Sequence, residues 1–150
     1  MRSSGHLHEK VDRKSEVNKD MKILGIDYGR TKMGIAVGDT VLKLAEPLQV
    51  LTSSKFKVQS SKLLAENAIE KIVIGVPGGK MDVEIKEFGA GLKKETGVRV
   101  EFFDETLTTQ DAQQLLIISG RKRKLRKEKE DAVAAAIMLQ YYLEGRDNDD

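Results

Sequence analysis

The stretch that decides the fold is residues 21–37, MKILGIDYGRTKMGIAV. Residues 22–28 (KILGIDY) form an apolar run typical of a strand, and residues 32–37 (KMGIAV) form a second one. Residues 29–31 (GRT) separate them, so the pattern predicts a β-hairpin. The glycines are dense for strands, which indicates close approach of another strand or of a ligand; they are Gly25, Gly29, Gly34 and Gly38.

Further along the chain, apolar runs alternate with helical patterns. Further strands are predicted at 44–51, 71–76 and 98–103, and Pro47 confines the first of them to an edge or a bulge. Helices are predicted at 54–67, across 81–92, from about Thr108 to Gly120 and at 128–143. Strands separated by helices favour parallel pairing. The expected fold is therefore α/β, a mixed sheet of three antiparallel strands followed by parallel ones and flanked by helices.

Length and composition bound the possible functions. The chain has 150 residues, enough for one domain, and we expect a flexible tail at 1–20, a domain at 21–144 and an acidic tail at 145–150. It contains no cysteine, and both histidines, His6 and His8, lie in the expected tail. Thiolate chemistry and histidine-based catalysis are therefore excluded, and no apolar stretch is long enough for a membrane span.

Three carboxylate positions remain as candidates for chemistry. Asp27 ends the first strand between glycines, Asp104 and Glu105 end the strand at 98–103, and Asp131 begins the last predicted helix. If these positions meet at one end of the sheet, their repulsion requires divalent cations. Oxygen ligands favour Mg²⁺ or Mn²⁺, and two such ions could act together on a phosphodiester.

Each carboxylate also has a simpler interpretation. Asp27 could be a turn residue or a phosphate-site ligand of an ATPase, and the pair Asp104 and Glu105 could be a solvated turn. Asp131 could be an acidic residue favoured by the dipole at a helix N-terminus. Only their joint placement on separate elements favours catalysis.

A basic run precedes Asp131. Residues 121–130 (RKRKLRKEKE) hold seven Lys or Arg against two Glu. The run could be a solvated loop, or it could bind the phosphate backbone beside the metal site. The residues expected to contact nucleic acid are Arg30, Lys32, Arg121, Lys122, Arg123, Lys124 and Arg126. With no tryptophan and seven other aromatic residues, a base-stacking platform is not expected.

Four separated blocks resemble the YqgF (RuvX) nuclease family. They are residues 21–40, residues 72–77 (IVIGVP), residues 104–109 (DETLTT) and residues 131–143, which begin DAVAA. The resemblance implies a ribonuclease H-like fold, a cytoplasmic location and maturation of the 5′ end of precursor 16S ribosomal RNA. It also implies that Asp27, Glu105 and Asp131 are the catalytic, metal-binding carboxylates, whereas Asp104 is structural. The family usually has arginine in place of Thr106, and lysine then arginine in place of Thr31 and Lys32.

The leading hypothesis is thus a Mg²⁺- or Mn²⁺-dependent endonuclease, with two ions, acting on precursor ribosomal RNA. A Holliday junction resolvase-like DNA nuclease and a non-catalytic RNA-binding ribosome assembly factor are the alternatives. A fragment of an actin-like ATPase is a further alternative. It is less favoured, because those ATPases need two lobes and 150 residues supply only one. The sequence does not distinguish a monomer from a homodimer, although resolvase activity on a four-way junction would require two symmetry-related sites.

Overall fold

The computed structural model describes residues 20–105 and 123–149, with side chains for 20–105 and 130–145. Its elements are β1 (Lys22–Asp27), β2 (Lys32–Asp39), β3 (Leu44–Thr52), α2 (Ser53–Glu66), β4 (Ile69–Val76), α3 (Met81–Thr96), β5 (Arg99–Asp104) and α5 (Arg123–Asp149). The helix predicted between Thr108 and Gly120 and all but the last residue of the expected tail at 1–20 lie outside these residues. The domain boundaries at 21 and 144 stay a prediction.

Within this part of the chain the strands form one sheet in the order β3-β2-β1-β4-β5. β2 pairs antiparallel with both β1 and β3, whereas β4 pairs parallel with β1 and β5. This confirms the predicted mixed sheet. Pro47 lies on the edge strand β3, where the register shifts between its partner Ala36 and Ile35. The expected bulge is therefore present, and it accommodates a residue that cannot donate a hydrogen bond.

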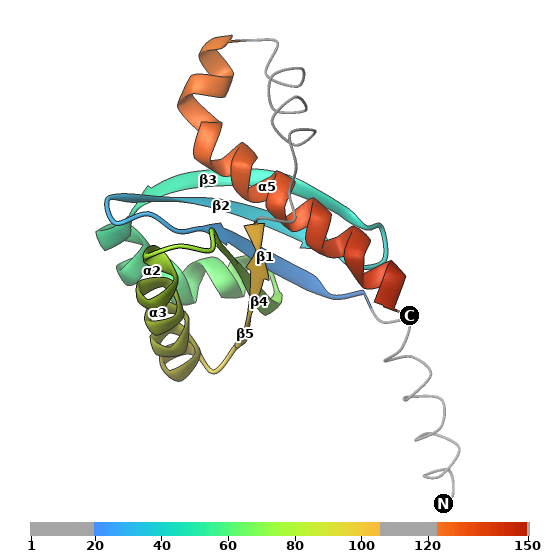
Figure 1. The fold of residues 1–150 in the computed structure, drawn as a ribbon, viewed down its shortest axis with the longest axis horizontal. Helices are drawn as coiled ribbons and strands as arrows, with labels where there is room; N and C mark the ends of the chain where they lie inside the picture. Colours follow the sequence, from blue (N-terminus) through green and yellow to red (C-terminus); the bar gives the residue numbers. More distant parts are fainter. Residues whose placement is uncertain (1–19, 106–122, 150) are drawn as a thin grey trace, which may run out of the picture.

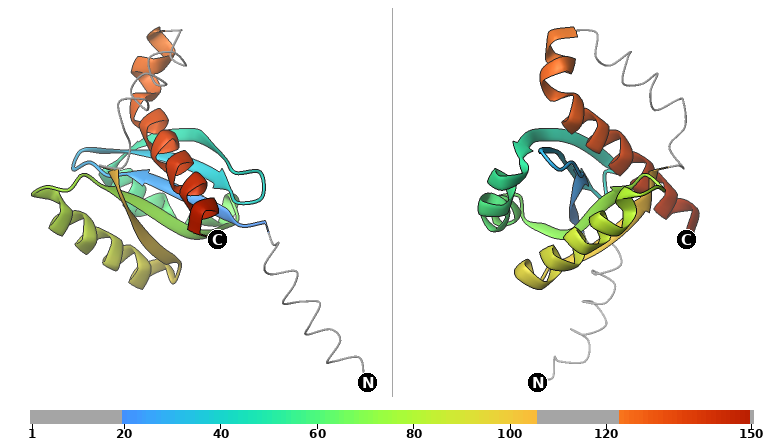
Figure 2. Two further views of the ribbon diagram at one scale, coloured as in Figure 1. Left: turned by 45° about the vertical axis from the view of Figure 1, so that its right-hand side comes forward. Right: turned by 60° about the vertical axis from the view of Figure 1, so that its left-hand side comes forward.

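Helices cover both faces of the sheet (Figures 1 and 2). Alternate residues of β1 point to opposite sides, so Leu24 and Ile26 join the core beneath α2 and α3, and Ile23 joins the core beneath α5. All three are fully buried. No helix in the described ranges is long and apolar enough to cross a membrane.

Glycines let α5 lie directly on the sheet; their density predicted the close approach of a strand or a ligand, and the element that approaches is this helix. A Cβ on Gly34 would be 1.9 Å from the carbonyl oxygen of Asp131, and a Cβ on Gly38 would be 2.9 Å from Leu139. Both distances are shorter than real Cβ contacts allow. The glycines of β2 therefore bring the helix backbone to the sheet surface.

The last helix is longer than predicted at both ends. It runs from Arg123 to Asp149, where the sequence predicts 128–143. The interpretation of residues 123–130 as a solvated loop is wrong, because Arg and Lys are good helix formers and the charged run continues the helix. The helix also passes through residues 145–149, which the sequence assigns to an acidic tail.

Candidate active site

The centre of the candidate site is a row of three residues across the sheet. Asp27, the last residue of β1, pairs with Gly34 of β2. On the other side, β1 pairs in parallel with β4 through Ile26 and Ile74, which puts Gly75 next to Asp27. Neighbouring residues in register point to the same face of a sheet, and Gly34 faces α5. Asp27 thus points to the α5 face between two residues that have no side chain.

Each of these glycines makes room for a second acidic residue. The α5 backbone at Asp131 lies directly over Gly34, which places Asp131 beside Asp27. The side chain of Glu105 lies over Gly75, where an added Cβ would be 2.7 Å from the Glu105 carboxyl carbon. The sheet therefore gathers Asp27, Glu105 and Asp131, three acidic residues from widely separated parts of the chain, at one end of one face.

Strand alternation explains why Glu105, and not Asp104, joins the cluster. Phe103 of β5 packs against Tyr142 of α5, so its side chain lies on the α5 face. Glu105 is two residues further on and shares that face, as the lining of Gly75 shows. Asp104 is exposed.

Asp131 lies in the interior of α5, nine positions into the helix. The interpretation as an acidic residue at a helix N-terminus is therefore wrong: no acidic residue occupies the first turn of α5. A macrodipole acts within the first turn only, so it does not account for Asp131. The position of this carboxylate is set by the contact between α5 and Gly34.

Burial and mutual repulsion make it unfavourable for all three carboxylates of the cluster to be ionised at once. Burial, followed by the negative charges of Glu105 and Asp131, raises the pKa of Asp27 from 3.8 to about 7. Burial, followed by the charge of Asp82, also raises the pKa of Glu105. A carboxylate that resists ionisation in this way is poised to gain from a bound cation.

The carboxylate oxygens of Asp27, Glu105 and Asp131 are suitable ligands for a hard divalent cation. Three carboxylates with no His or Cys are the ligands that Mg²⁺ and Mn²⁺ prefer. Among residues 20–105 and 130–145, however, no three acidic, His or Cys side chains are arranged as a ready-made coordination shell. The backbone thus brings the ligands to one place, and rotation of their side chains has to complete the shell.

Two of the predicted nucleic-acid contacts lie at this end of the sheet. The Nζ atom of Lys32 is 3.4 Å from Oδ2 of Asp131. Asp27, Arg30, Lys32 and Asp131 all line one open cavity of about 300 Å³. Lys32 is thus a cation beside the carboxylates.

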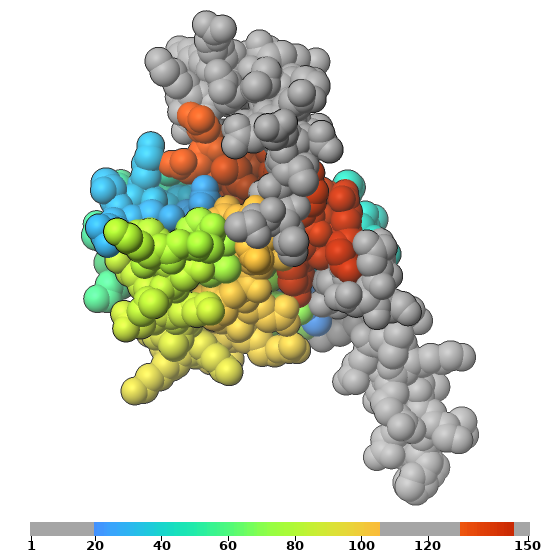
Figure 3. All heavy atoms as spheres, in the orientation of Figure 1, coloured from blue at the N-terminus to red at the C-terminus, as the bar shows by residue number. Residues whose placement is uncertain are grey.

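Arg30 is held by a carboxylate that the sequence analysis did not identify. Its Nη2 and Nε atoms donate to Glu84 of α3 at 2.9 and 3.1 Å, and the Tyr28 hydroxyl donates to the same carboxylate at 2.7 Å. The hydrogen bonds from Arg30 and then Tyr28 lower the pKa of Glu84. Figure 3 shows the β1–β2 hairpin, in blue, beside the light green start of α3. The contact fixes the hairpin that follows Asp27.

Asp82 is a second residue that sequence reasoning missed. Its Oδ1 atom accepts hydrogen bonds from the backbone N–H groups of Gly78 and Gly79 at 3.0 and 3.2 Å. It thereby orders the loop after β4, and its charge acts on Glu105. The signal for it was an acidic residue in the first turn of the helix predicted after Gly78 and Gly79, where a carboxylate can reach back to the backbone N–H groups that precede the helix.

The remaining predicted contacts are in the basic run. Arg123, Lys124 and Arg126 belong to the first turns of α5, the helix that carries Asp131. Arg121 and Lys122 lie outside the described residues. The contact of all five with nucleic acid stays a prediction.

Comparison with known proteins decides the family. A family model described as RuvX, Holliday junction resolvase, matches residues 21–145. The chain belongs to the RuvX family. Relatives named "Putative pre-16S rRNA nuclease" include one from Agathobacter rectalis, 35% identical over 136 residues that cover 83% of this chain and 95% of that protein. Another, from Rickettsia typhi, is 38% identical over 132 residues, which cover 81% of this chain and 83% of that protein.

Solved structures show the fold of this RuvX family member. RuvC of T. thermophilus, in complex with Holliday junction substrate, superposes with a TM-score of 0.52 at 19% identity, covering 84% of this chain and 96% of that one. The Holliday junction resolvase of fowlpox virus superposes with a TM-score of 0.54 at 13% identity, covering 83% and 99%. The predicted ribonuclease H-like fold is confirmed.

Proposed function

We propose that this chain is a metal-dependent endonuclease that cuts phosphodiester bonds in precursor 16S ribosomal RNA, at the 5′ end of the mature sequence. The observation that carries the proposal is the cluster around Asp27, where burial and two neighbouring carboxylates raise the pKa to about 7. Such a cluster is unfavourable for the fold alone and useful for binding divalent cations. The names of the relatives support the choice of RNA.

Asp27, Glu105 and Asp131 would hold Mg²⁺ or Mn²⁺, with two ions in the complete site. When bound, such ions activate water and stabilise the leaving oxygen of a phosphodiester. Asp27 is central because it lies between the two other carboxylates in the row across the sheet. Because Gly75 has no side chain, the Glu105 carboxylate can lie over it, next to Asp27. Because Gly34 has none either, the α5 backbone at Asp131 can lie directly on the sheet.

The cationic residues would bind and orient the RNA backbone. Lys32 lies beside Asp131 and can turn to a phosphate once a metal neutralises that carboxylate. The side chain of Arg30 is 72% exposed even though Glu84 holds it, so it can contact a phosphate with its outer edge. The basic residues Arg121, Lys122, Arg123, Lys124 and Arg126 would extend this contact along the strand, with an affinity that falls steeply with salt.

The test is cleavage of a precursor 16S leader RNA by the purified protein in Mg²⁺. We expect Asp27→Asn to reduce the cleavage rate by about a thousandfold, because metal-ion catalysis contributes several kcal/mol to the transition state. Asp104→Asn is the matched control, one residue from Glu105 and exposed, and it should cut at close to the wild-type rate. Equal cleavage by the Asp27→Asn protein would assign the activity to a contaminant.

A resolvase-like DNA nuclease is the second candidate, favoured by the family description and by the similarity to RuvC bound to a Holliday junction. The same proteins should be assayed on a four-way DNA junction. Faster cleavage of the junction than of the leader RNA would favour this candidate. A third outcome, RNA binding that survives the change of all three carboxylates to amides with no cleavage at any metal concentration, would favour a non-catalytic assembly factor.

A further inference from the structure

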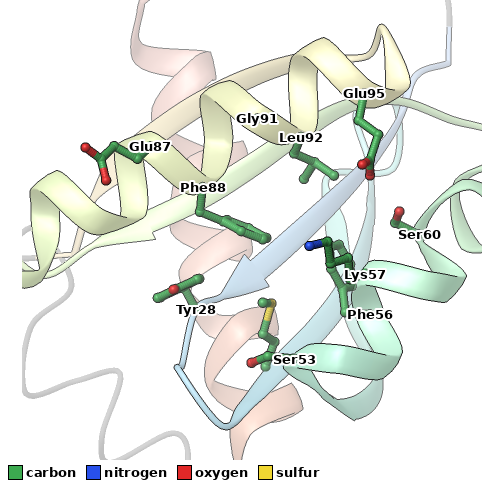
Figure 4. A pocket seen from close by; sticks show the side chains of 11 residues that line it. Tyr28, Ser53, Phe56, Lys57, Ser60, Glu87, Phe88, Gly91, Leu92 and Glu95 are labelled. Atoms are coloured by element: carbon green, nitrogen blue, oxygen red, sulfur yellow. The ribbon is translucent and has the colours of Figure 1, made fainter.

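A second cavity lies on the opposite face of the sheet from α5, between α2 and α3 (Figure 4). Its volume is about 350 Å³, within the usual range of ligand sites. Met33, Phe56 and Leu92 form its buried floor, and Tyr28 and Phe88 stand beside it, half-buried. The cavity is thus a mainly apolar groove that contains three aromatic side chains and is open to solvent.

The groove contains a glycine that the fold does not explain. Gly89 and Gly91 both lie in α3, and glycine is unfavourable in a helix interior. A Cβ on Gly89 would be 2.5 Å from the Phe102 ring, so packing against β5 requires glycine there. A Cβ on Gly91 would meet nothing within 4 Å, and Gly91 lines the groove. A bare helix surface beside an open groove permits close approach of a flat ligand.

The groove also contains a buried polar group. Ser60 of α2 lines it with only 2% of its surface exposed. Across the part of the chain that the structure describes, no hydrogen bond or other polar contact is made by the Ser60 hydroxyl. A buried hydroxyl normally has a partner, and an occupant of the groove can supply it.

Tyr28 joins this groove to the candidate active site. It follows Asp27 directly, and it lines both the groove and the cavity that holds Asp27 and Asp131. Because successive residues of a strand point to opposite faces, Asp27 points toward α5 and Tyr28 toward α2 and α3. The Tyr28 ring lies 4.9 Å from Phe88, and Phe88 lies 5.9 Å from Phe56. Tyr28 therefore lies between the two cavities, at the end of the sheet that carries the carboxylates.

We propose that the groove between α2 and α3 binds one unpaired nucleobase of the substrate strand, next to the phosphodiester that is cut. The proposal rests on the proposed function and adds a subsite to it. The base lies flat against the bare surface at Gly91, with the aromatic side chains of Phe88 and Phe56 around it, and its polar edge takes a hydrogen bond from Ser60. Three of the seven aromatic residues meet here.

The charged residues that line the groove are one cation, Lys57, and two carboxylates, Glu87 and Glu95. Lys57 of α2 extends into the gap between the helices, where it can pair with a phosphate, and Glu95 of α3 can accept a hydrogen bond from the amino group of a base (Figure 4). Adenine, cytosine and guanine carry such an amino group, and uracil does not. The groove therefore selects an unpaired base with an amino group, in a flexible single-stranded part of the substrate.

The test uses a short single-stranded RNA in which 2-aminopurine replaces one adenine at a time, bound to the full-length protein in EDTA so that no cleavage occurs. Stacking quenches 2-aminopurine, and we expect strong quenching at one position. Gly91→Leu fills the groove with a good helix former. It should abolish the quenching and weaken RNA binding about tenfold, the size expected for one stacked base.

Ala90→Leu is the matched control, because Ala90 is exposed on the same helix and does not line the groove. It should keep both the quenching and the affinity, and Asp27→Asn should keep the quenching. Quenching that persists in Gly91→Leu, or RNA binding without quenching at any position, would overturn the subsite and leave the proposed nuclease intact. No RNA binding by any of the proteins, measured by anisotropy of an end-labelled RNA, would overturn the subsite, and the absence of Mg²⁺-dependent cleavage of the leader RNA would overturn the proposed nuclease as well.

Discussion

Two polar clusters lie under α5 at opposite ends of the same sheet face, and their charges are balanced in opposite ways. At one end Lys71, with 3% of its side chain exposed, donates to Glu101 at 3.0 Å and to the Tyr142 hydroxyl at 2.8 Å, and Tyr142 donates to Glu101 at 2.7 Å. At the other end Asp27 faces two further carboxylates, and Lys32, the cation paired with Asp131, is 63% exposed.

The pKa values of Glu101 and Asp27 are shifted in opposite directions. Burial pushes the pKa of Glu101 upward, but the hydrogen bonds from Tyr142 and Lys71 outweigh it and hold that pKa below its ordinary value. Burial pushes the pKa of Asp27 upward as well, and there the neighbouring charges add to the shift. A buried polar network in which every charge has a partner of opposite charge stabilises the fold. A buried cluster of like charges lowers stability, and we infer that this one is retained because it binds a ligand.

Breaking the complete cluster should have the largest effect on stability. Lys71→Met removes the buried ammonium that contacts both Glu101 and Tyr142, so we expect the free energy of unfolding to fall by about 3 kcal/mol. Urea denaturation measures it. Arg99→Ala is the control, because Arg99 is 68% exposed and 3.4 Å from the same Glu101 carboxylate. It should cost less than about 1 kcal/mol, and equal losses in the two variants would contradict the assignment of the network to the buried lysine.

Displacing α5 should have an intermediate effect that reaches the carboxylates. Gly34→Ala puts a methyl group against the Asp131 carbonyl, so the helix must shift, at a cost of about 2 kcal/mol. Cleavage should fall with it, because Asp131 moves relative to Asp27. Gly145→Ala, where an added Cβ meets nothing within 4 Å, is the control. A Gly34→Ala protein that is as stable and as active as wild type would contradict the close contact of α5 with β2.

Removing the cation beside the cluster should have the smallest effect. Lys32→Met breaks an exposed pair with Asp131, so stability should change by less than about 1 kcal/mol. Mn²⁺ should then bind up to about fivefold more tightly in calorimetry, because the ammonium no longer competes for the carboxylate. Lys62→Met, which breaks an exposed pair on α2, is the control. Weaker Mn²⁺ binding by the Lys32→Met protein would show that Lys32 supports the metal site.

Much of the fold follows from local patterns. The apolar runs predict the strands, and Pro47 predicts the bulge on the edge strand, because these signals depend on neighbours in the chain. The place of Asp27 at a strand end follows in the same way. The glycines predict close approach, but which element approaches is a tertiary fact that only the packing of α5 on Gly34 supplies.

The errors have physical causes too. Asp131 looks like the start of a helix because charged residues precede it, yet Arg and Lys extend a helix as readily as they form a loop. The pairing of Arg30 with Glu84 joins residues 54 positions apart, and no local pattern encodes it. The aromatic groove was missed because Tyr28, Phe56 and Phe88 come from three elements that meet only in the folded chain.

The central claim is that Asp27 belongs to a carboxylate cluster that divalent cations neutralise, and the most direct measurement is the stability of wild-type and Asp27→Asn protein against pH. Since the folded pKa of about 7 lies above the ordinary 3.8, the folded state binds the proton more tightly. Stability from this group is therefore lost as pH rises from about 4 to about 7.

Without metal, we expect wild type to lose on the order of 4 kcal/mol relative to Asp27→Asn between about pH 4 and pH 8. Mg²⁺ should restore that stability at pH 8 in wild type and have little effect on the variant. Parallel pH profiles for the two proteins, with no stabilisation of wild type by Mg²⁺, would contradict the claim.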